Sequence, residues 1–247
     1  MSALLVLHQV EKRFGGLQAV KDVSFEVQKG ERRTIIGPNG AGKTSLFHCI
    51  SGVLQATSGH MHFKGLDITH VPEHRRTSLG VGRTFQISSV FTELTVLENI
   101  ALAQMGIQKG KWDLWHSALS TPGLRERAAV LLQRVGLKGK EQVTVKFMSY
   151  GERRQLELVL ALINEPELLL LDEPCAGLSP AERHRLADII AALPRSITML
   201  MIEHDMDIAL AMADRVTVMH QGAVILDGTA NDAREDQRVK EVYFGQI

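Results

Sequence analysis

The segment GPNGAGKT (37–44) decides how the fold is interpreted, because it matches the pattern Gly-x4-Gly-Lys-Thr in full. It lies between a predicted strand, RRTIIG (32–37), and a predicted helix, SLFHCISGV, which is the context that supports such a motif. Glycines let the backbone wrap closely around phosphate groups and present N–H groups at the start of a helix. A plain glycine turn does not need Lys43 and Thr44 after its last glycine. The segment therefore predicts a phosphate-binding loop for a nucleotide.

The residues of this loop have distinct expected tasks. Lys43 is expected to reach the β- and γ-phosphates and is placed among the catalytic residues, and Thr44 is expected to hold Mg²⁺. The other positions expected to bind the nucleotide are Gly37, Pro38, Asn39, Gly40, Ala41, Gly42 and Ser45.

A second segment, LLLLDEP (168–174), is an apolar strand that ends in two acids. A buried strand of an open α/β sheet brings its last residues to the carboxyl edge, where ligands bind. Asp172 is therefore expected to organise Mg²⁺, and Glu173 is expected to be the base or orienting group for an attacking water. Taken alone, the segment also fits a polar strand end stopped by Pro174. The phosphate loop upstream favours the catalytic interpretation.

Two more polar residues close predicted strands: Gln86 ends GVGRTFQ, and His204 ends ITMLMIEH. A lone histidine or glutamine at a strand end is more often solvated than catalytic. The predicted sheet edge nevertheless gathers both with the two motifs above. Gln86 is expected to contact Mg²⁺ and water, and His204 is expected to hydrogen-bond the γ-phosphate.

The order of the predicted elements indicates an α/β fold. Strands and helices alternate in the first fifth and the last third of the chain, and buried runs such as LLLL and ITMLMI are typical of parallel strands. The stretch from about residue 93 to 164 is helical instead. The predicted fold is a P-loop NTPase core with a mostly parallel sheet, an antiparallel β part and an inserted helical subdomain.

The composition of the 247 residues is that of a soluble globular protein with a formal net charge of zero, so no global field favours nucleic acid as a partner. The two cysteines, Cys49 and Cys175, lie far apart and are expected to be free thiols. The first residues lack a signal-peptide pattern, and nowhere do eighteen apolar residues run together. The chain is expected in the cytosol, unless a partner holds it at a membrane.

A third segment, FMSYGERRQLELVL (147–160), is predicted to open a helix. Ser149 and Glu152 have the spacing of a capping box, in which each side chain bonds the backbone N–H of the other. Apolar residues then recur at helical spacing, as expected of one buried face: Leu156, Val159, Leu160 and Ile163.

The order GPNGAGKT, Gln86, SYGE, LLLLDEP, AGLSP and His204 resembles the nucleotide-binding subunit of an ATP-binding cassette (ABC) transporter over essentially the whole chain. The resemblance implies an ATPase that uses ATP and Mg²⁺, and a single domain, 1–247. Its α/β core is expected at about 1–92 and 165–230, its helical subdomain at about 93–164 and a tail at about 231–247. The resemblance also implies that the adenine stacks on Phe14, for which an ordinary core-edge position is the alternative.

In that family, the loop matching Met148–Glu152 closes over ATP held by a second subunit, in a head-to-tail dimer. Ser149 and Gly151 are therefore expected to face the partner's γ-phosphate. Tyr150 and Glu152 depart from the usual Leu-Ser-Gly-Gly-Gln, and their roles are left open. Ser179 stands where the family commonly has an acid, which puts communication across the dimer through that acid in doubt.

Three segments are similar to importer subunits for branched-chain amino acids and related small polar solutes, urea among them: GRTFQISSVFTELTVLENI, the excursion 104–121, and DEPCAGLSPAE with IEHDMD. This resemblance implies a second ATPase subunit, identical or different, integral membrane permease subunits and, indirectly, a solute-binding protein. The chain is then peripheral on the cytoplasmic face of the inner membrane. Ile87 to Asn99 is the expected permease contact, although Val90, Phe91 and Leu94 fit a core equally well.

Three rival functions stay open at this point. A small-molecule kinase would not explain SYGE. Repair or translation ATPases of the same superfamily usually carry coiled-coil insertions or two cassettes, and this chain has neither. The subunit for lipopolysaccharide transport shares the size and layout of this chain.

Overall fold

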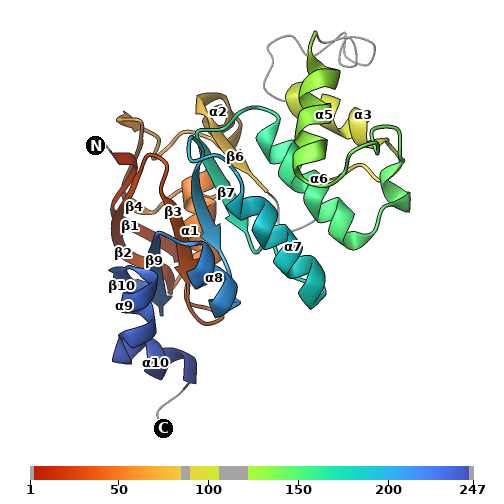
Figure 1. The fold of residues 1–247 in the computed structure, drawn as a ribbon. Helices are drawn as coiled ribbons and strands as arrows, with labels where there is room; N and C mark the ends of the chain where they lie inside the picture. The colour runs from red at the N-terminus through yellow and green to blue at the C-terminus, as the bar shows by residue number, and fades with distance from the viewer. Residues whose placement is uncertain (1–2, 85–89, 106–121, 245–247) are drawn as a thin grey trace. The chain divides into compact units, whose positions relative to one another are not determined.

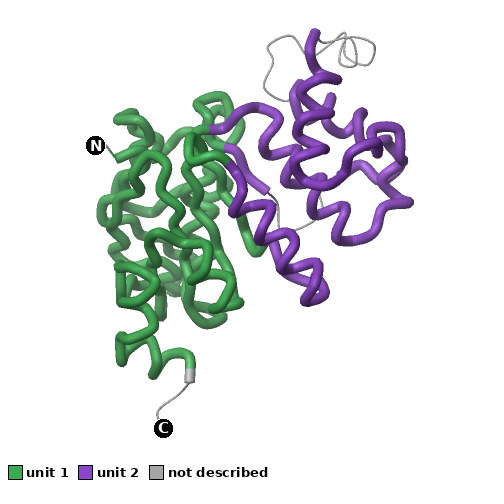
Figure 2. Tube along the Cα trace, in the orientation of Figure 1, with its two compact units in different colours: residues 1–81, 167–173, 194–247 green, residues 82–166, 174–193 purple. Residues whose placement is uncertain are grey.

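The computed structural model describes residues 3–84, 90–105 and 122–244, and these form two compact units. The first unit consists of residues 1–81, 167–173 and 194–247, and the second unit of residues 82–166 and 174–193 (Figure 2). The sequence predicted a helical block at 93–164. Residue contacts also assign the turn and helix that follow Glu173 to the helical unit.

A six-stranded sheet of order β10-β9-β3-β8-β7-β6 carries the predicted motifs (Figure 1). β3 pairs in parallel with β8 and β9, β8 pairs in parallel with β7, and β9 and β10 form an antiparallel hairpin. Every residue of β3, β7 and β8 is buried. β7 and β8 are accordingly mostly apolar rather than alternating, whereas β3 also buries Arg32, Arg33 and Thr34. The strands are β3 (Arg32–Ile36), β6 (Val81–Arg83), β7 (Leu168–Asp172), β8 (Thr198–Ile202), β9 (Arg215–His220) and β10 (Ala223–Gly228).

An antiparallel sheet of order β2-β1-β4-β5 completes the strands of the first unit and confirms the expected antiparallel part. β1 and β2 are long, and the turn at Gly15 places Phe14 opposite Leu17. The strands are β1 (Ala3–Phe14), β2 (Leu17–Gln28), β4 (Ser58–Phe63) and β5 (Leu66–Asp67).

Helix α1 (Lys43–Ser51) packs between these two sheets. Its Leu46, Phe47 and Ile50 are fully buried in one apolar cluster with side chains of both sheets. The other helices of the first unit are α2 (Glu73–Leu79), α8 (Met206–Met212), α9 (Ala230–Glu235) and α10 (Gln237–Phe244).

The C-terminal end of α1 is held by a buried cation from α2. The guanidinium of Arg76, 1% exposed, donates to the carbonyl oxygens of Cys49 and Ile50, each at 2.7 Å. It also donates to those of Val71 and Ile68, at 2.7 and 2.6 Å. Burial lowers the pKa of Arg76 to about 10, so the group is still charged at neutral pH. A cation at this place satisfies the last carbonyls of the helix and complements its dipole.

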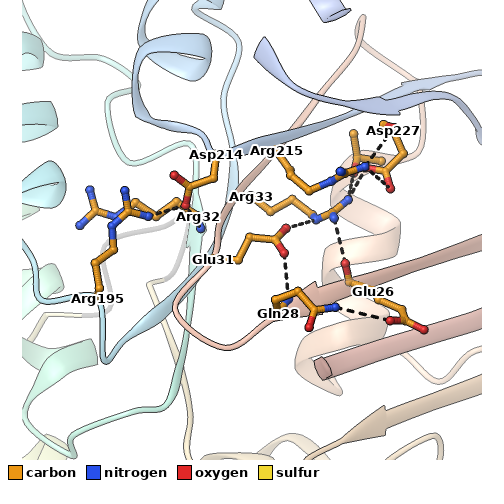
Figure 3. A network of polar contacts seen from close by, with 10 residues as sticks. Glu26, Gln28, Glu31, Arg32, Arg33, Arg195, Asp214, Arg215 and Asp227 are labelled. Atoms are coloured by element: carbon orange, nitrogen blue, oxygen red, sulfur yellow. Dashed lines mark hydrogen bonds and ion pairs between the residues drawn. The ribbon is translucent and has the colours of Figure 1, made fainter. Parts of the chain in front are cut away.

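A second buried cation, Arg33 of β3, ties strands from both sheets together (Figure 3). It bonds Glu31 at 2.8 Å, Thr217 of β9 at 2.8 Å and the carbonyl oxygen of Glu26 of β2 at 2.8 Å, and it pairs with Asp227 of β10. A buried charge with this many partners favours one register of the strands over others.

The second unit is built on α6 (Tyr150–Leu162), against which α3 (Val96–Met105) and α5 (Leu124–Arg134) pack. The buried residues of α5 are Leu124, Ala128 and Leu132, which recur at four-residue spacing on one face. A short 3₁₀ turn (Val145–Phe147) leads into α6, and α7 (Pro180–Ala191) belongs to the same unit. Among the described helices, none has the length and apolar character required to cross a membrane.

Candidate functional site

The phosphate loop connects the end of β3 to the start of α1, as the motif predicted. Gly37, Gly40 and Gly42 all have positive φ, at 151°, 80° and 98°. Two of them also lie against other backbone: a Cβ would be 2.2 Å from the Met219 carbonyl oxygen at Gly37, and 2.2 Å from that of Ala19 at Gly42. Backbone conformation favours glycine at all three positions, and close packing also requires it at Gly37 and Gly42.

Lys43 is the first residue of α1, and its side chain turns back over the loop. The ammonium donates to the carbonyl oxygens of Gly37 at 2.7 Å and Pro38 at 3.0 Å. Only 5% of the residue is exposed, and burial lowers the pKa of Lys43, while the nearby charges of Glu173 and Asp172 oppose that effect. The geometry places one cation and two acids together at this edge of the sheet.

Glu173 and His204 come from the carboxyl ends of neighbouring parallel strands, β7 and β8. His204 Nε2 lies 2.6 Å from Glu173 Oε1, so the two groups share a hydrogen bond. Glu173 has a positive φ of 47°, which is uncommon for a residue with a side chain, and its N–H donates to the Ile202 carbonyl oxygen at 3.0 Å. The sheet thus brings together two residues that are 31 positions apart in the sequence.

A pocket of about 580 Å³ lies at this edge, within the first unit. Phe14 lines it; the residue is 45% exposed, and Lys12 Nζ lies 5.0 Å from the centroid of its ring. Phe14 is therefore accessible from the pocket, and its stacking on adenine stays a prediction. Predicted residues also on its wall are Asn39, Gly40, Ala41, Gly42, Lys43, Thr44, Ser45, Glu173 and His204.

The structure adds pocket residues that the sequence analysis did not identify. They come from the start of β2 and from the β9–β10 turn: Leu17, Gln18, Ala19, Lys21, Gln221 and Gly222. Gly222 N–H donates to the Ala41 carbonyl oxygen at 2.9 Å, and Lys21 N–H donates to that of Gly222 at 2.8 Å. The Gln-Gly pair has φ of 48° and 86°, which signals a tight hairpin turn, but nothing in that signal indicates a contact with the phosphate loop.

The residues proposed for Mg²⁺ fit that ion chemically. Asp172, the last residue of β7, is 1% exposed, and Thr44 lines the pocket from the first turn of α1. A carboxylate and a hydroxyl are hard oxygen donors, which Mg²⁺ prefers. Gln86, the third residue expected to contact the ion, lies outside the described residues.

Ser149 and Gly151 lie at the N-terminus of α6, in the second unit. Ser149 is the N-cap: its Oγ accepts from the Glu152 N–H at 3.2 Å, and its own N–H donates to Glu152 Oε2 at 3.0 Å. The predicted capping box is therefore present. Lys140 pairs with Glu152 Oε1, and this bond holds the pKa of Glu152 below its usual range although burial opposes it.

The chain is similar to known proteins over nearly its whole length. The family model described as ABC transporter matches residues 20–176. The high-affinity branched-chain amino acid transport ATP-binding protein LivG of Salmonella typhimurium is 38% identical, over 98% of this chain and 98% of that protein. BraF of Pseudomonas aeruginosa, of the same description, is 36% identical over 98% of each. The crystal structure of the ADP conformation of MJ1267, an ATP-binding cassette of an ABC transporter, has a TM-score of 0.87 and 30% identity over 100% of both chains. The chain therefore belongs to the ABC transporter family, in which it is an ATPase subunit.

Proposed function

We propose that this chain is the ATP-hydrolysing subunit of an importer for branched-chain amino acids or related small polar solutes. The observation that carries the enzymatic part is the Glu173–His204 pair, 2.6 Å apart, on the wall of the pocket that the phosphate loop lines. The solute is inferred from LivG and BraF, which are transport proteins for branched-chain amino acids and align with almost the whole chain.

In the proposed site, the phosphates of ATP lie against the N–H groups of residues 39–45 and against Lys43. Thr44, Asp172 and Gln86 would hold Mg²⁺, which neutralises charge on the β- and γ-phosphates when bound. Phe14 stacks on the adenine. The loop geometry and the exposure of Phe14 support the nucleotide part of this proposal.

The proposed chemistry transfers the γ-phosphoryl group to water. Glu173 accepts a proton from the attacking water, whose oxygen bonds to the γ-phosphorus as the bond to the bridging oxygen of ADP breaks. His204 Nε2 bonds Glu173 in the nucleotide-free geometry, and with ATP bound the same N–H donates instead to an oxygen of the γ-phosphate. The products are ADP and phosphate.

The proposed assembly is a head-to-tail dimer in which two ATP molecules lie at the interface. Ser149 and Gly151 of each subunit face the γ-phosphate held by the partner. The dimer binds permease subunits at the cytoplasmic face of the inner membrane, where residues 87–99 form the contact, and a solute-binding protein delivers the solute. The whole chain forms one ABC ATPase domain in this proposal.

Replacement of Glu173 by Gln tests the enzymatic part. The variant is expected to bind ATP, release no phosphate, and elute as a dimer only when ATP is present. Normal hydrolysis by Glu173→Gln would show that Glu173 is not the general base. Glu165→Gln, at an exposed glutamate three residues after the end of α6, is the matched control and should hydrolyse ATP normally.

The solute is tested separately with membranes that contain the complete transporter. Uptake of labelled leucine, isoleucine or valine is expected with the native chain and is expected to be lost with Glu173→Gln. Copurification followed by identification of the membrane partners distinguishes this importer from a lipopolysaccharide transporter. Uptake that is unaffected by Glu173→Gln would contradict the assignment of the chain to this importer. It would not contradict the assignment of the chain as an ATPase.

A further inference from the structure

One side chain, Tyr150, joins the start of α6 to the turn that precedes α7, within the second unit. Its hydroxyl donates to the carbonyl oxygen of Ala176 at 3.2 Å. The same oxygen accepts two bonds from Arg154, from Nε at 3.1 Å and from a terminal nitrogen at 2.8 Å. The hydroxyl therefore uses its donor and both acceptor positions.

The position of this hydroxyl is fixed by Arg154, which forms a buried ion pair with Glu157 on the same helix. Arg154 is 8% exposed and bonds Glu157 Oε2 at 2.9 Å, three residues further along the same helix. Its guanidinium carbon lies 5.3 Å from the centroid of the Tyr150 ring, so the cation also contacts the ring. Rotation of Tyr150 away from Ala176 would break three hydrogen bonds and leave Arg154 less well paired.

The turn at 175–178 presents the carbonyl that Tyr150 binds. Leu178 N–H donates to the Cys175 carbonyl oxygen at 3.4 Å, and Gly177 has a φ of 75°. A turn of this form leaves the carbonyl of its second residue, Ala176, without a partner inside the turn. A Cβ on Gly177 would lie 3.1 Å from the Tyr150 hydroxyl, so the turn and the ring are in close contact.

A second contact lies beside the first. Gly151 follows Tyr150, and a Cβ there would lie 2.7 Å from Glu182 Oε1. Glu182 belongs to the capping box that Ser179 forms at the start of α7. The N-termini of α6 and α7 are thus packed together by a glycine and tied together by a hydrogen bond.

We infer that Tyr150 is a positioning residue that makes the start of α6 and the turn 175–178 move as one piece. The inference rests on the proposed function, in which Ser149 and Gly151 face the ATP of the partner. Ala176 is three residues after Glu173, the proposed general base of the chain's own site. The Tyr150–Ala176 bond therefore links closure over one ATP to the segment that carries the general base for the other.

Tyr150→Phe tests this link, because it keeps the ring and removes the hydroxyl. ATP hydrolysis by the purified chain is expected to slow about fivefold, because only one of the three lost hydrogen bonds, that to Ala176, joins α6 to the turn. KM for ATP is expected to change less than about twofold, because the variant leaves the phosphate loop intact. The Hill coefficient for ATP is expected to fall to about 1, because the two sites no longer act together.

Arg153→Ala is the matched control. Arg153 donates to the carbonyl oxygen of Lys146 at 3.0 Å, so it also anchors the first turn of α6, but none of its bonds goes to residues 174–179. The control is expected to retain the Hill coefficient and rate of the native chain. Equal loss in both variants would overturn the inference, since any weakening of the helix start would then suffice.

Gly177→Ala approaches the same bond from the other side, because the added methyl presses on the hydroxyl and strains the turn. It is expected to reproduce the kinetic pattern of Tyr150→Phe, and the double variant should be no slower than the slower single one. Native kinetics in Tyr150→Phe would overturn the inference and leave the proposed function standing. Absence of ATP hydrolysis in the native chain would overturn both.

Discussion

The N-termini of α1 and α6 are two helix starts of opposite construction. The N-cap of α1 is Gly42, which has no side chain, and its first turn contains no acidic residue. The N-cap of α6 is Ser149, and Glu152 closes a capping box with it. The first helix leaves its N–H groups open to an external anion, whereas the second satisfies part of its own. Under the proposed function, the open start of α1 holds phosphate, and the capped start of α6 contacts the phosphate that a second subunit holds.

The largest expected effect comes from giving α1 the acid that α6 has. Ser45 is the third residue of α1, as Glu152 is of α6, so Ser45→Glu places a carboxylate at the phosphate site. ATP affinity is expected to fall by roughly a thousandfold, because the new charge repels the phosphates in a partly buried pocket. Titration calorimetry measures the change. Ser58→Glu, at an exposed strand position, is the control and should bind ATP normally. Normal binding by Ser45→Glu would contradict the interpretation that the open start of α1 binds phosphate.

The next largest effect is expected at the C-terminal end of α1, where a substitution of Arg76 lowers the stability of the fold. Arg76→Met is expected to lower the free energy of unfolding by about 3–5 kcal/mol, because it removes a charged donor from buried carbonyl groups at the end of α1. Urea unfolding measures it. Arg75→Met, at the exposed neighbouring position, is the control and should change the free energy by less than about 0.5 kcal/mol. Equal effects of the two substitutions would show that the hydrogen bonds of Arg76 add little to the free energy of unfolding.

A smaller effect is expected from removing the N-cap of α6 or of α7, two helices of the second unit. Ser149→Ala and Ser179→Ala each remove an N-cap with a capping box, so each is expected to lower the free energy of unfolding by about 1 kcal/mol. Under the proposed function, Ser149→Ala also weakens ATP-driven dimerisation in the Glu173→Gln background, by about fivefold. Dimerisation followed by analytical ultracentrifugation should be less affected by Ser179→Ala. Equal weakening by both would argue against a phosphate contact at Ser149.

The smallest expected effect is a pH dependence of stability from Glu152. The bond from Lys140 and, secondarily, the N-cap bonds from Ser149 hold the pKa of Glu152 below its unfolded value, although burial opposes this. A carboxylate of this kind stabilises the fold above the unfolded pKa, about 4.3, and loses that contribution as pH falls through the folded pKa. Relative to Glu152→Gln, the native chain should lose less than about 1 kcal/mol between pH 6 and pH 3, because the group is partly exposed. Urea unfolding at several pH values measures the difference, and identical pH profiles would contradict it.

The sequence predicted the phosphate loop, the acidic strand end and the capping box because each is a local pattern of a few adjacent residues. Phe14 required the family resemblance, since a single aromatic residue beside a glycine turn has several explanations. The contacts of Gly222 and Tyr150 could not be predicted from the sequence, for another reason. Their partners, Ala41 and Ala176, contribute only carbonyl oxygens, and no residue type marks a position whose backbone accepts a distant bond.

The order of strands around β3 has a consequence for synthesis on the ribosome. The phosphate loop is made early, but the strands on both sides of β3 are β8 and β9, and the turn that binds Ala41 contains Gly222. At 5–20 residues per second, the gap between these segments takes roughly 10 to 35 s to translate. During that interval the nascent chain carries the nucleotide motif without the neighbours that shape it. Competence to bind ATP is therefore acquired near the end of translation, which makes it a signal that the whole first unit has folded.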